Sequence, residues 1–441
     1  MMPARPPHPL APRRGIAALT VVMILFFVMA MVAAYTNRNL VFEQRISANS
    51  YRSNRALEAA DAGVEWAVAM LNAGRVDANC QATNNNAFGD FRSRYLVEAD
   101  NAVNVASGEG GYTLQWGANF ANRIYPACII RDGALNCICP IAGAVAPAIG
   151  APADGIGSAF RITLILPGNA VRAGAMQFIS RGCSNPGTGD TACFAQTNAM
   201  PAVDGVSAAL TTVGLVRALP IAPIAPLTAG GVIDATAGKL VVTNFDPQTD
   251  GITVRTGAVV ADFRDSATSE YSQLQAGVET KQLDVPELAA AAATYEGWFR
   301  ALFGMDSATY REQPAVMRVA CAAGCTLADL NNTLAGYPRN PIWVDGNLNI
   351  DAVANLGSAA DPLMLIVTGT LTVSANATVR GFVHANQVRW NSAATLDGAL
   401  VSATTFTTTA VATLRYDKAA LDTIRLRYGS FVRAPGSWNL F

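Results

Sequence analysis

Histidine is almost absent from this chain: two of its 441 residues are histidines, and one of these, His384, follows the N-terminal apolar segment. His384 lies in a predicted strand, Phe382 to Asn386, with no Gly-x-Ser-x-Gly motif nearby. Catalysis of the Ser/His/Asp type would depend on this one residue, and no glycine-rich phosphate loop is present. The spacing of Asp345 and Asp397 gives no support for a glycan-hydrolysing pair. We therefore predict no enzyme activity, no catalytic residue and no cofactor.

Charge is also scarce. Charged residues make up 14% of the chain, the net charge is −1, and lysine is rare. No basic stripe is available for contacts with phosphates, which excludes a nucleic-acid partner, and the composition does not fit a disordered tail. Four aspartates near the C-terminus lack the dense acidic pattern of a calcium loop and are predicted to be solvated turn residues, with no metal bound: Asp345, Asp351, Asp361 and Asp397.

One long apolar run stands near the N-terminus. The 20 residues from Ile16 to Tyr35 carry no charge, and as a helix they span the ~30 Å core of a bilayer. Arg5, Arg13 and Arg14 precede the run, so the leader is expected in the cytoplasm and the rest of the chain in the periplasm, anchored in the inner membrane. Two simple alternatives stay open: a signal peptide cleaved after Val32-Ala33-Ala34, and an uncleaved anchor.

Proline is missing between Pro12 and Pro126, which permits a long helix. Apolar residues beyond the membrane run recur at helical spacing up to Leu71, so the helix is predicted to continue to about Asn72, roughly 85 Å in all, with Gly74 as its C-cap. The polar stretch from Ser47 to Asn54 is predicted to bend. The upper half of this helix must rest on a folded domain to be stable.

The cysteines are even in number, and all of them follow the apolar run, which in an exported chain predicts disulfides. Their pairing does not follow from sequence, although Cys183 with Cys193 and Cys321 with Cys325 are close enough to close small loops. Cys137-Ile138-Cys139 has the wrong spacing for a zinc knuckle. The disulfide candidates are Cys80, Cys128, Cys137, Cys139, Cys183, Cys193, Cys321 and Cys325.

The remainder is rich in strand and turn signals. Strands are predicted at Gly111–Trp116, Phe160–Leu166 and Ala175–Ile179, and they should form an antiparallel sheet against the upper helix. The proline-spaced stretch from Pro220 to Pro226 predicts an extended linker. Beyond it, one helix is expected near residues 286–302, with Asp284 as its cap.

Near the C-terminus, one pattern repeats four times: apolar, polar, Gly, any residue, apolar, centred on Gly346, Gly369, Gly381 and Gly398. It predicts a short, imperfect β-solenoid, with a twisted ordinary sheet as the alternative. The expected class is α+β. The expected organisation is a leader at 1–15, a helix at 16–74 with its membrane span at 16–35, a headgroup at 75–219, a linker at 220–230 and a distal β-rich domain at 231–441.

Several of these segments together resemble a known family. A basic leader ending in Gly15, an apolar helix from Ile16, and the segments 42–49 (FEQRISAN) and 57–65 (LEAADAGVE) resemble the N-terminal module of PilX-type minor pilins of type IV pilus biogenesis. Residues 137–140 (CICP) and 435–438 (PGSW) also resemble segments of large PilX-like proteins. The resemblance touches most of the chain, though thinly between Met200 and Met305.

The resemblance implies that prepilin peptidase cuts between Gly15 and Ile16 and that the new amino group is methylated. The helix, with Thr20 and Glu43, would then pack with the helices of other minor and major pilins. Thr20 is the fifth mature residue, where major pilins carry Glu, and it cannot pair with a neighbour's amino terminus; this favours an initiating or tip position. Expected partners are those pilins, the peptidase, the inner membrane and a tip adhesin.

Three function classes follow. The first is a minor pilin that initiates or caps a type IV pilus, with a role in adhesion or motility, and it ends on the cell surface. The second is a minor pseudopilin of a type II secretion system. The third is a membrane-anchored β-helical glycan-binding protein, in which Gly15 has no role.

Overall fold

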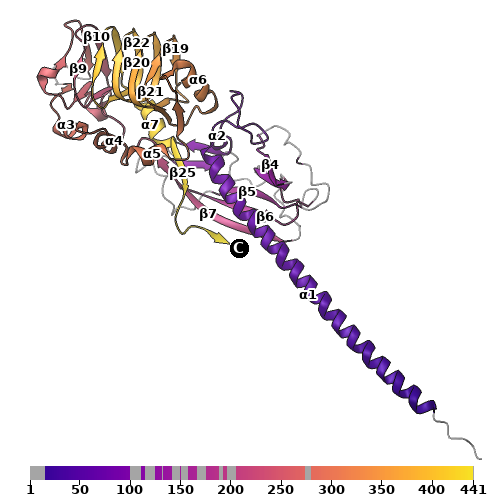
Figure 1. Ribbon diagram of the computed structural model, residues 1–441. Helices are drawn as coiled ribbons and strands as arrows, with labels where there is room; N and C mark the ends of the chain where they lie inside the picture. Colours follow the sequence, from indigo (N-terminus) through magenta and orange to yellow (C-terminus); the bar gives the residue numbers. More distant parts are fainter. Residues whose placement is uncertain are drawn as a thin grey trace, which may run out of the picture.

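The computed structural model describes residues 15–99, 111–114, 125–131, 133–141, 149, 157–165, 175–187, 192–195, 205–273 and 280–440. Residues 1–14 of the predicted leader and Trp116 lie outside these residues. A long helix, an antiparallel sheet and a stack of parallel strands make up the fold (Figure 1). The predicted α+β class is confirmed.

The long helix α1 runs from Gly15 to Asn72, 58 residues. It is continuous, so the predicted bend at residues 47–54 is wrong: polar side chains that face solvent do not interrupt the backbone hydrogen bonds, and no Gly or Pro lies there. Gly74 is not a left-handed cap, because its φ is not among the positive values. It allows a close approach instead, since a Cβ on Gly74 would lie 2.3 Å from the carbonyl oxygen of Gly336.

The upper part of α1 packs on an antiparallel sheet of order β25-β7-β6-β5-β3-β4, with β26 also on β7. Small residues of the helix, from Ala56 through Ala60 to Val64, are fully buried. A Cβ on Gly182 of β6 would lie 2.1 Å from the carbonyl oxygen of Ala56, so helix and strand touch backbone to backbone. The strands are β3 (Ala127–Arg131), β4 (Ala134–Ile138), β5 (Ala159–Ile165), β6 (Ala175–Cys183), β7 (Val206–Arg217), β25 (Gly429–Arg433) and β26 (Asn439–Leu440).

A short helix and a hairpin follow α1: α2 (Phe91–Tyr95), β1 (Leu96–Ala99) and β2 (Gly111–Leu114). The strands β1 and β2 pair with each other in a sheet of their own. The predicted strand at Gly111–Trp116 is therefore present up to Leu114.

The distal part is a sheet of 17 strands in which every described pairing is parallel. The strands are β8 (Leu227–Ala229), β9 (Ile233–Asp234), β10 (Lys239–Asn244), β11 (Val254–Thr256), β12 (Phe263–Arg264), β13 (Glu270–Gln273), β14 (Lys281–Gln282), β15 (Met317–Ala320), β16 (Cys325–Thr326), β17 (Ile342–Asp345), β18 (Leu348–Ile350), β19 (Ala354–Leu356), β20 (Leu363–Val373), β21 (Ala377–Trp390), β22 (Ala394–Ser402), β23 (Phe406–Thr408) and β24 (Val411–Arg415). We call this part the solenoid.

The glycine pattern marks where its rungs stack. Gly381 and Gly398 are register partners, both with φ near +142°, and the amide of Gly369 donates to the carbonyl of Gly346 at 2.9 Å. The chain enters in the middle of the stack, because β8 pairs with β22. From β8 the chain forms the rungs on one side of the entry point, up to β13 and β14. It then passes through helices to β15 at the far end of the stack, and the strands from β15 to β24 form the rungs on the other side.

The returning helices are α3 (Pro286–Ala292), α4 (Tyr295–Phe303) and α5 (Ser307–Arg311), while α6 (Leu327–Gly336) and α7 (Lys418–Arg427) complete the set. One helix was expected over 286–302, and there are two. Asp284 does not cap the first: Val285 is at its N-cap and Asp284 has a φ of 55°. Thr294 interrupts the expected helix because its side chain accepts from the Gly297 amide and starts α4.

The solenoid is an insertion in the headgroup sheet. Strand β7 ends at Arg217, strand β25 begins at Gly429, and these two residues are register partners. The predicted distal domain at 231–441 is therefore too long, because its last strands, β25 and β26, pair with β7 of the headgroup sheet. The predicted linker at 220–230 was also wrong in part, since β8 within it pairs with β11 and β22.

Candidate assembly surface

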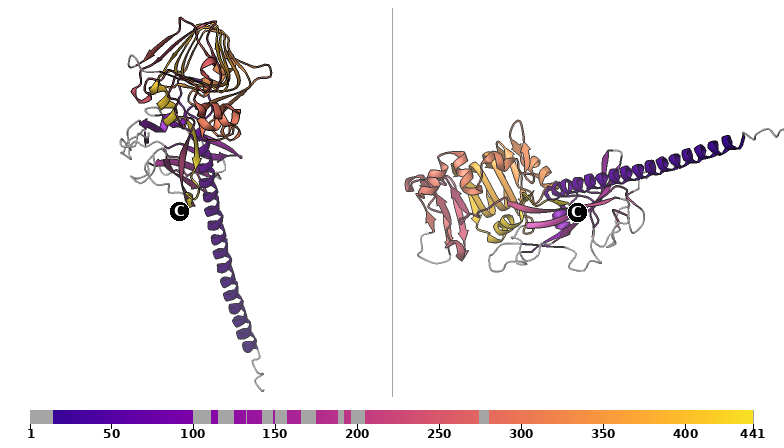
Figure 2. Two further views of the ribbon diagram at one scale, coloured as in Figure 1. Left: turned by 90° about the vertical axis from the view of Figure 1, so that its left-hand side faces the viewer. Right: turned by 90° about the horizontal axis from the view of Figure 1, so that it is seen from below.

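The lower part of α1 has no cover within the described residues. Every residue from Ala18 to Arg55 is exposed, including large apolar side chains such as Phe26 at 74% and Ile46 at 64%. In the described part of the chain, α1 is the one helix long and apolar enough to cross a bilayer. Figure 2 shows the helix projecting alone from the folded part. Such a surface needs lipid or other protein against it.

The exposed helix has two parts with different chemistry. The apolar run ends at Tyr35, and residues 36–55, which we call the neck, carry charges between apolar residues. Thr20 lies in the apolar run and Glu43 in the neck, about 35 Å apart along the axis. The structure therefore does not bring these two predicted assembly residues together. Gly15 and Ile16 form the start of α1, next to the leader outside the described residues.

The upper end of α1 is fastened by buried polar contacts. Arg92 donates from Nη2 to the carbonyl of Gly429 at 2.6 Å and also from Nε to the carbonyl of Leu71. The Arg75 amide donates to the Gly336 carbonyl at 2.7 Å, which ties the segment just after α1 to α6 of the solenoid. Leu71 lies in the last turn of α1, where the negative end of the helix dipole favours a guanidinium. Arg92 thus joins the end of α1 to strand β25, and Arg75 joins the segment after α1 to the solenoid.

All eight cysteines are paired. Cys80 bonds Cys139, Cys128 bonds Cys137, Cys183 bonds Cys193, and Cys321 bonds Cys325. The first bridge joins the loop after α1 to the end of β4, the second crosses β3 and β4, and the fourth lies just before α6. Three of the four bridges therefore strengthen the headgroup.

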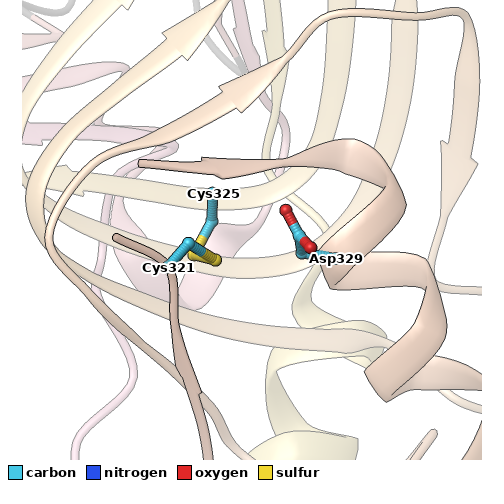
Figure 3. Close-up of side chains that lie close together, drawn as sticks. All are labelled: Cys321, Cys325 and Asp329. Atoms are coloured by element: carbon cyan, nitrogen blue, oxygen red, sulfur yellow. A yellow bond between two sulfur atoms is a disulfide. The ribbon is translucent and has the colours of Figure 1, made fainter. Parts of the chain in front are cut away.

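One cluster has metal-like composition: Cys321, Cys325 and Asp329 lie within 4.8 Å of one another (Figure 3). Its sulfurs are joined in a disulfide and are not thiolates, which a metal requires. Asp329 accepts from the Thr326 amide and hydroxyl, both at 2.8 Å, and these bonds hold the pKa of its carboxyl below the usual range. Asp329 thus forms a capping box with Thr326, which is the N-cap residue of α6.

The four aspartates considered for calcium bind protein groups. Asp351 and Asp361 lie between strands as predicted, but Asp345 and Asp397 belong to strands β17 and β22, so the predicted turn positions are wrong for these two. Asp345 accepts from Trp343 Nε1 at 2.7 Å and Arg318 Nη2 at 3.2 Å. The others have their own contacts: Asp351 with the Leu327 amide, Asp361 with Arg339 and Asp397 with Arg415. The structure does not gather them into one site.

His384 is fully buried beneath α4, among the rings of Tyr295, Phe299 and Phe303. Neither ring nitrogen has a hydrogen-bond partner among the described residues. Burial lowers the pKa of His384 from 6.5 to about 3, so the ring is neutral at neutral pH. A substrate in solvent cannot reach it.

Sequence reasoning missed Asn72 and Arg92, which join the end of α1 to β25, and Arg75, which contacts α6 of the solenoid. Their partners lie hundreds of residues away in the sequence, as with Arg92 and Gly429. No local sequence pattern predicts contacts between residues so far apart in the chain.

Comparison with known proteins agrees with the resemblance in the lower helix. Residues 14–65 match the PilX N-terminal family, which covers the apolar run, the neck and the first buried turns of α1. Among solved structures, the competence-associated pilin ComZ from Thermus thermophilus is similar at 10% identity, covering 88% of this chain and 98% of that chain, with a TM-score of 0.21. No curated protein matches. The resemblance of the N-terminal segment to the PilX type is confirmed, and with it a type IV pilin-related helix.

Proposed function

We propose that this chain is a minor pilin-type structural subunit that starts or caps a type IV pilus. The observation that carries the proposal is the PilX N-terminal match at residues 14–65, which coincides with the exposed part of α1. A helix that is apolar, projecting and uncovered is suited to leave a bilayer and pack with other helices. The expected partners are major and minor pilins, prepilin peptidase and the inner membrane.

The position of the solenoid supports a starting or capping place. It lies beyond the upper end of α1 and in line with the helix (Figures 1 and 2). A subunit stacked above would meet this domain, whereas the space around the neck is open. Thr20 agrees with such a place, because a first subunit has no preceding amino terminus to pair with.

The distal solenoid is the part that a starting subunit would present outward. We propose adhesion or motility as the process it influences, through direct surface contact or through a tip adhesin.

A secretion pseudopilin is the second candidate. It would share the leader and the missing Glu at the fifth mature position, but a large minor pseudopilin is expected to carry a helical insertion in its pilin fold in place of a β-stack. The solenoid therefore favours the pilus. The third candidate, an anchored β-helical glycan-binding protein, gives no role to Gly15.

The N-terminal mass of the mature protein tests the proposal. We expect a chain that begins at methylated Ile16, and a Gly15→Val variant that keeps its leader. A wild-type chain that begins at Met1 or Tyr35 would overturn the pilin-type assignment.

Deletion of the gene separates pilus from secretion. We expect fewer surface pili with normal exoprotein secretion, and restoration by the wild-type gene but not by Gly15→Val. Intact piliation with lost secretion would favour the pseudopilin.

A further inference from the structure

Two helices cover one face of the solenoid without a polar contact to its strands. Residues 286–303 form α3 and α4, which lie along the stack (Figure 1), and we call them the strap. Among the described residues, no hydrogen bond or ion pair joins the strap to a strand of the solenoid. Two polar groups that the strap buries, the hydroxyl of Tyr295 and Nε1 of Trp298, have no partner in this part of the chain. The strap is therefore held on the strands by apolar contacts.

The apolar contacts come mainly from α4. Trp298, Phe299 and Phe303 of α4 are buried, whereas α3 has no buried residue. These rings pack on side chains of the parallel strands, such as Phe382 of β21, whose ring centroid lies 6.1 Å from that of Phe303. An open strap would expose aromatic side chains on both sides of this contact.

The chain is fastened on both sides of the strap. Before α3, the amide of Val285 donates to strand β11 at 3.0 Å. After α4, the hydroxyl of Tyr310 in α5 donates to the carbonyl of Ala218 at 2.9 Å. Between α4 and this second anchor lies Gly304, a left-handed residue with a φ of 71°, where a Cβ would meet nothing within 4 Å. The strap can therefore move away from the strands while its two anchors stay in place.

His384 of β21 lies beneath α4. Its ring centroid is 5.7 to 6.2 Å from those of Tyr295, Phe299 and Phe303, and the residue is fully buried. A protonated ring has two N–H donors, and the described residues supply an acceptor to neither nitrogen. A buried charge without a partner is costly. The closed strap therefore excludes the charged form of His384.

Burial is the only cause of the low pKa of His384, so no charged side chain of the described residues acts on it. Tyr295 is the titratable group in contact with the ring, and burial raises the pKa of its phenol, which stays neutral. The register partners of His384 on β20 and β22 are the apolar Ile366 and Val401. The charged residues of the surrounding elements are exposed or have other partners: Glu296 and Arg300 on α4, Arg311 on α5, Asp345 on β17, Arg380 and Arg389 on β21, and Lys418, Asp422, Arg425 and Arg427 on α7.

We propose that the strap is an acid-sensitive cover, which lies closed on the strands at neutral pH and opens when His384 takes up a proton. Opening exposes the aromatic side chains of α4 and of the strands beneath it. This inference concerns the solenoid alone and does not depend on the proposed assembly role.

Hydrogen exchange of the full chain in detergent tests the proposal. With the ring exposed, His384 takes up its proton near pH 6.5, and under the closed strap near pH 3, so a change from pH 7.5 to 5.0 favours the open strap roughly 30-fold. We expect the protection factors of the α4 amides, each relative to an unstructured peptide at the same pH, to fall by about this factor. The α7 amides are the internal reference and should keep their protection.

Two results with the wild type would overturn the proposal. An equal fall in α4 and α7 would mean that the whole solenoid loosens, and unchanged protection of α4 would mean that the strap stays closed. Neither result requires a variant.

His384→Leu is the matched control, because leucine is apolar and has no titratable group. Its α4 amides should have the same protection at pH 5.0 and pH 7.5, and the protection of its α7 amides at pH 7.5 shows that the variant folds. A fall in the variant as large as that in the wild type would assign the acid response to another group and refute the role of His384.

Discussion

The side chain of Asn72 pairs with the backbone of Phe431, 359 residues away. Its Nδ2 donates to the Phe431 carbonyl at 2.9 Å, and its Oδ1 accepts from the Phe431 amide at 2.8 Å. The side-chain amide of Asn72 thus makes the two hydrogen bonds that a neighbouring strand would make with the free edge of β25. The last residue of α1 thereby holds the strand that follows the inserted solenoid.

Replacement of Asn72 by Ala should therefore destabilise the headgroup. Both backbone groups of the buried Phe431 would lose their partners, at a cost of about 2 to 4 kcal/mol in the free energy of unfolding. Urea unfolding of the full chain in detergent, followed by tryptophan fluorescence, measures this.

Asn332→Ala on α6 is the matched control, because Asn332 is exposed. It should change the free energy of unfolding by less than about 0.5 kcal/mol. A similar loss in both variants would show that the Asn72 pairing contributes nothing specific.

The contacts of Asn72 mark the limit of what the sequence reveals. The helix followed from the missing prolines and from apolar spacing, and the stacked rungs followed from Gly381 and Gly398, because these signals are local. The return of β25 to β7 did not follow, since edge pairing depends on which strand is left free after folding. For the same reason the solenoid was expected after the headgroup and not within it.

The assembly surface divides in the same way. The apolar run and Gly15 can be recognised in the sequence. The contacts of Arg92 with the helix end and β25 cannot be predicted in this way, because its acceptors are backbone carbonyls, which any residue supplies. His384 shows the opposite case. A single histidine is a candidate catalytic residue when only the sequence is known, but in the folded chain His384 is buried under α4.

Gly398→Ala should break the stacking of the solenoid rungs. A Cβ at this position would lie 1.8 Å from the carbonyl oxygen of Gly381, and the φ of Gly398 is +142°. Together, clash and strain should cost roughly 3 kcal/mol or more. The measurement is the thermal unfolding transition of the distal part.

Gly214→Ala on β7 is the control, since a Cβ there meets nothing within 4 Å. It should be close to neutral. If the Gly398→Ala variant unfolds at the same temperature as the wild type, the close contact between the rungs at Gly381 and Gly398 does not contribute to stability as predicted.

The disulfides should differ in their contribution to stability. Cys80–Cys139 spans 59 residues and Cys321–Cys325 spans 4. Loop-closure entropy gives roughly 4 kcal/mol for the first and roughly 2 kcal/mol for the second. Unfolding of the paired serine variants, each against the wild type, tests this order. An equal or reversed order would mean that loop entropy does not control the difference.

His384 should make stability depend on pH in a defined window. The unfolded chain binds a proton at His384 near pH 6.5, whereas the folded chain does so near pH 3. Between these values the unfolded state holds more protons, so folding loses stability as the pH falls. The loss is about 1.4 kcal/mol per pH unit from this residue.

His384→Leu removes both the proton and the two buried ring nitrogens that lack partners among the described residues. The variant should be more stable than the wild type at pH 7, and its advantage should grow as the pH is lowered from 6.5 toward 3. All carboxylates are retained, so the difference between the two unfolding curves isolates this residue. A difference that stays constant with pH would mean that His384 takes up its proton at the same pH in the folded and unfolded chains. Water would then reach the ring in the folded chain.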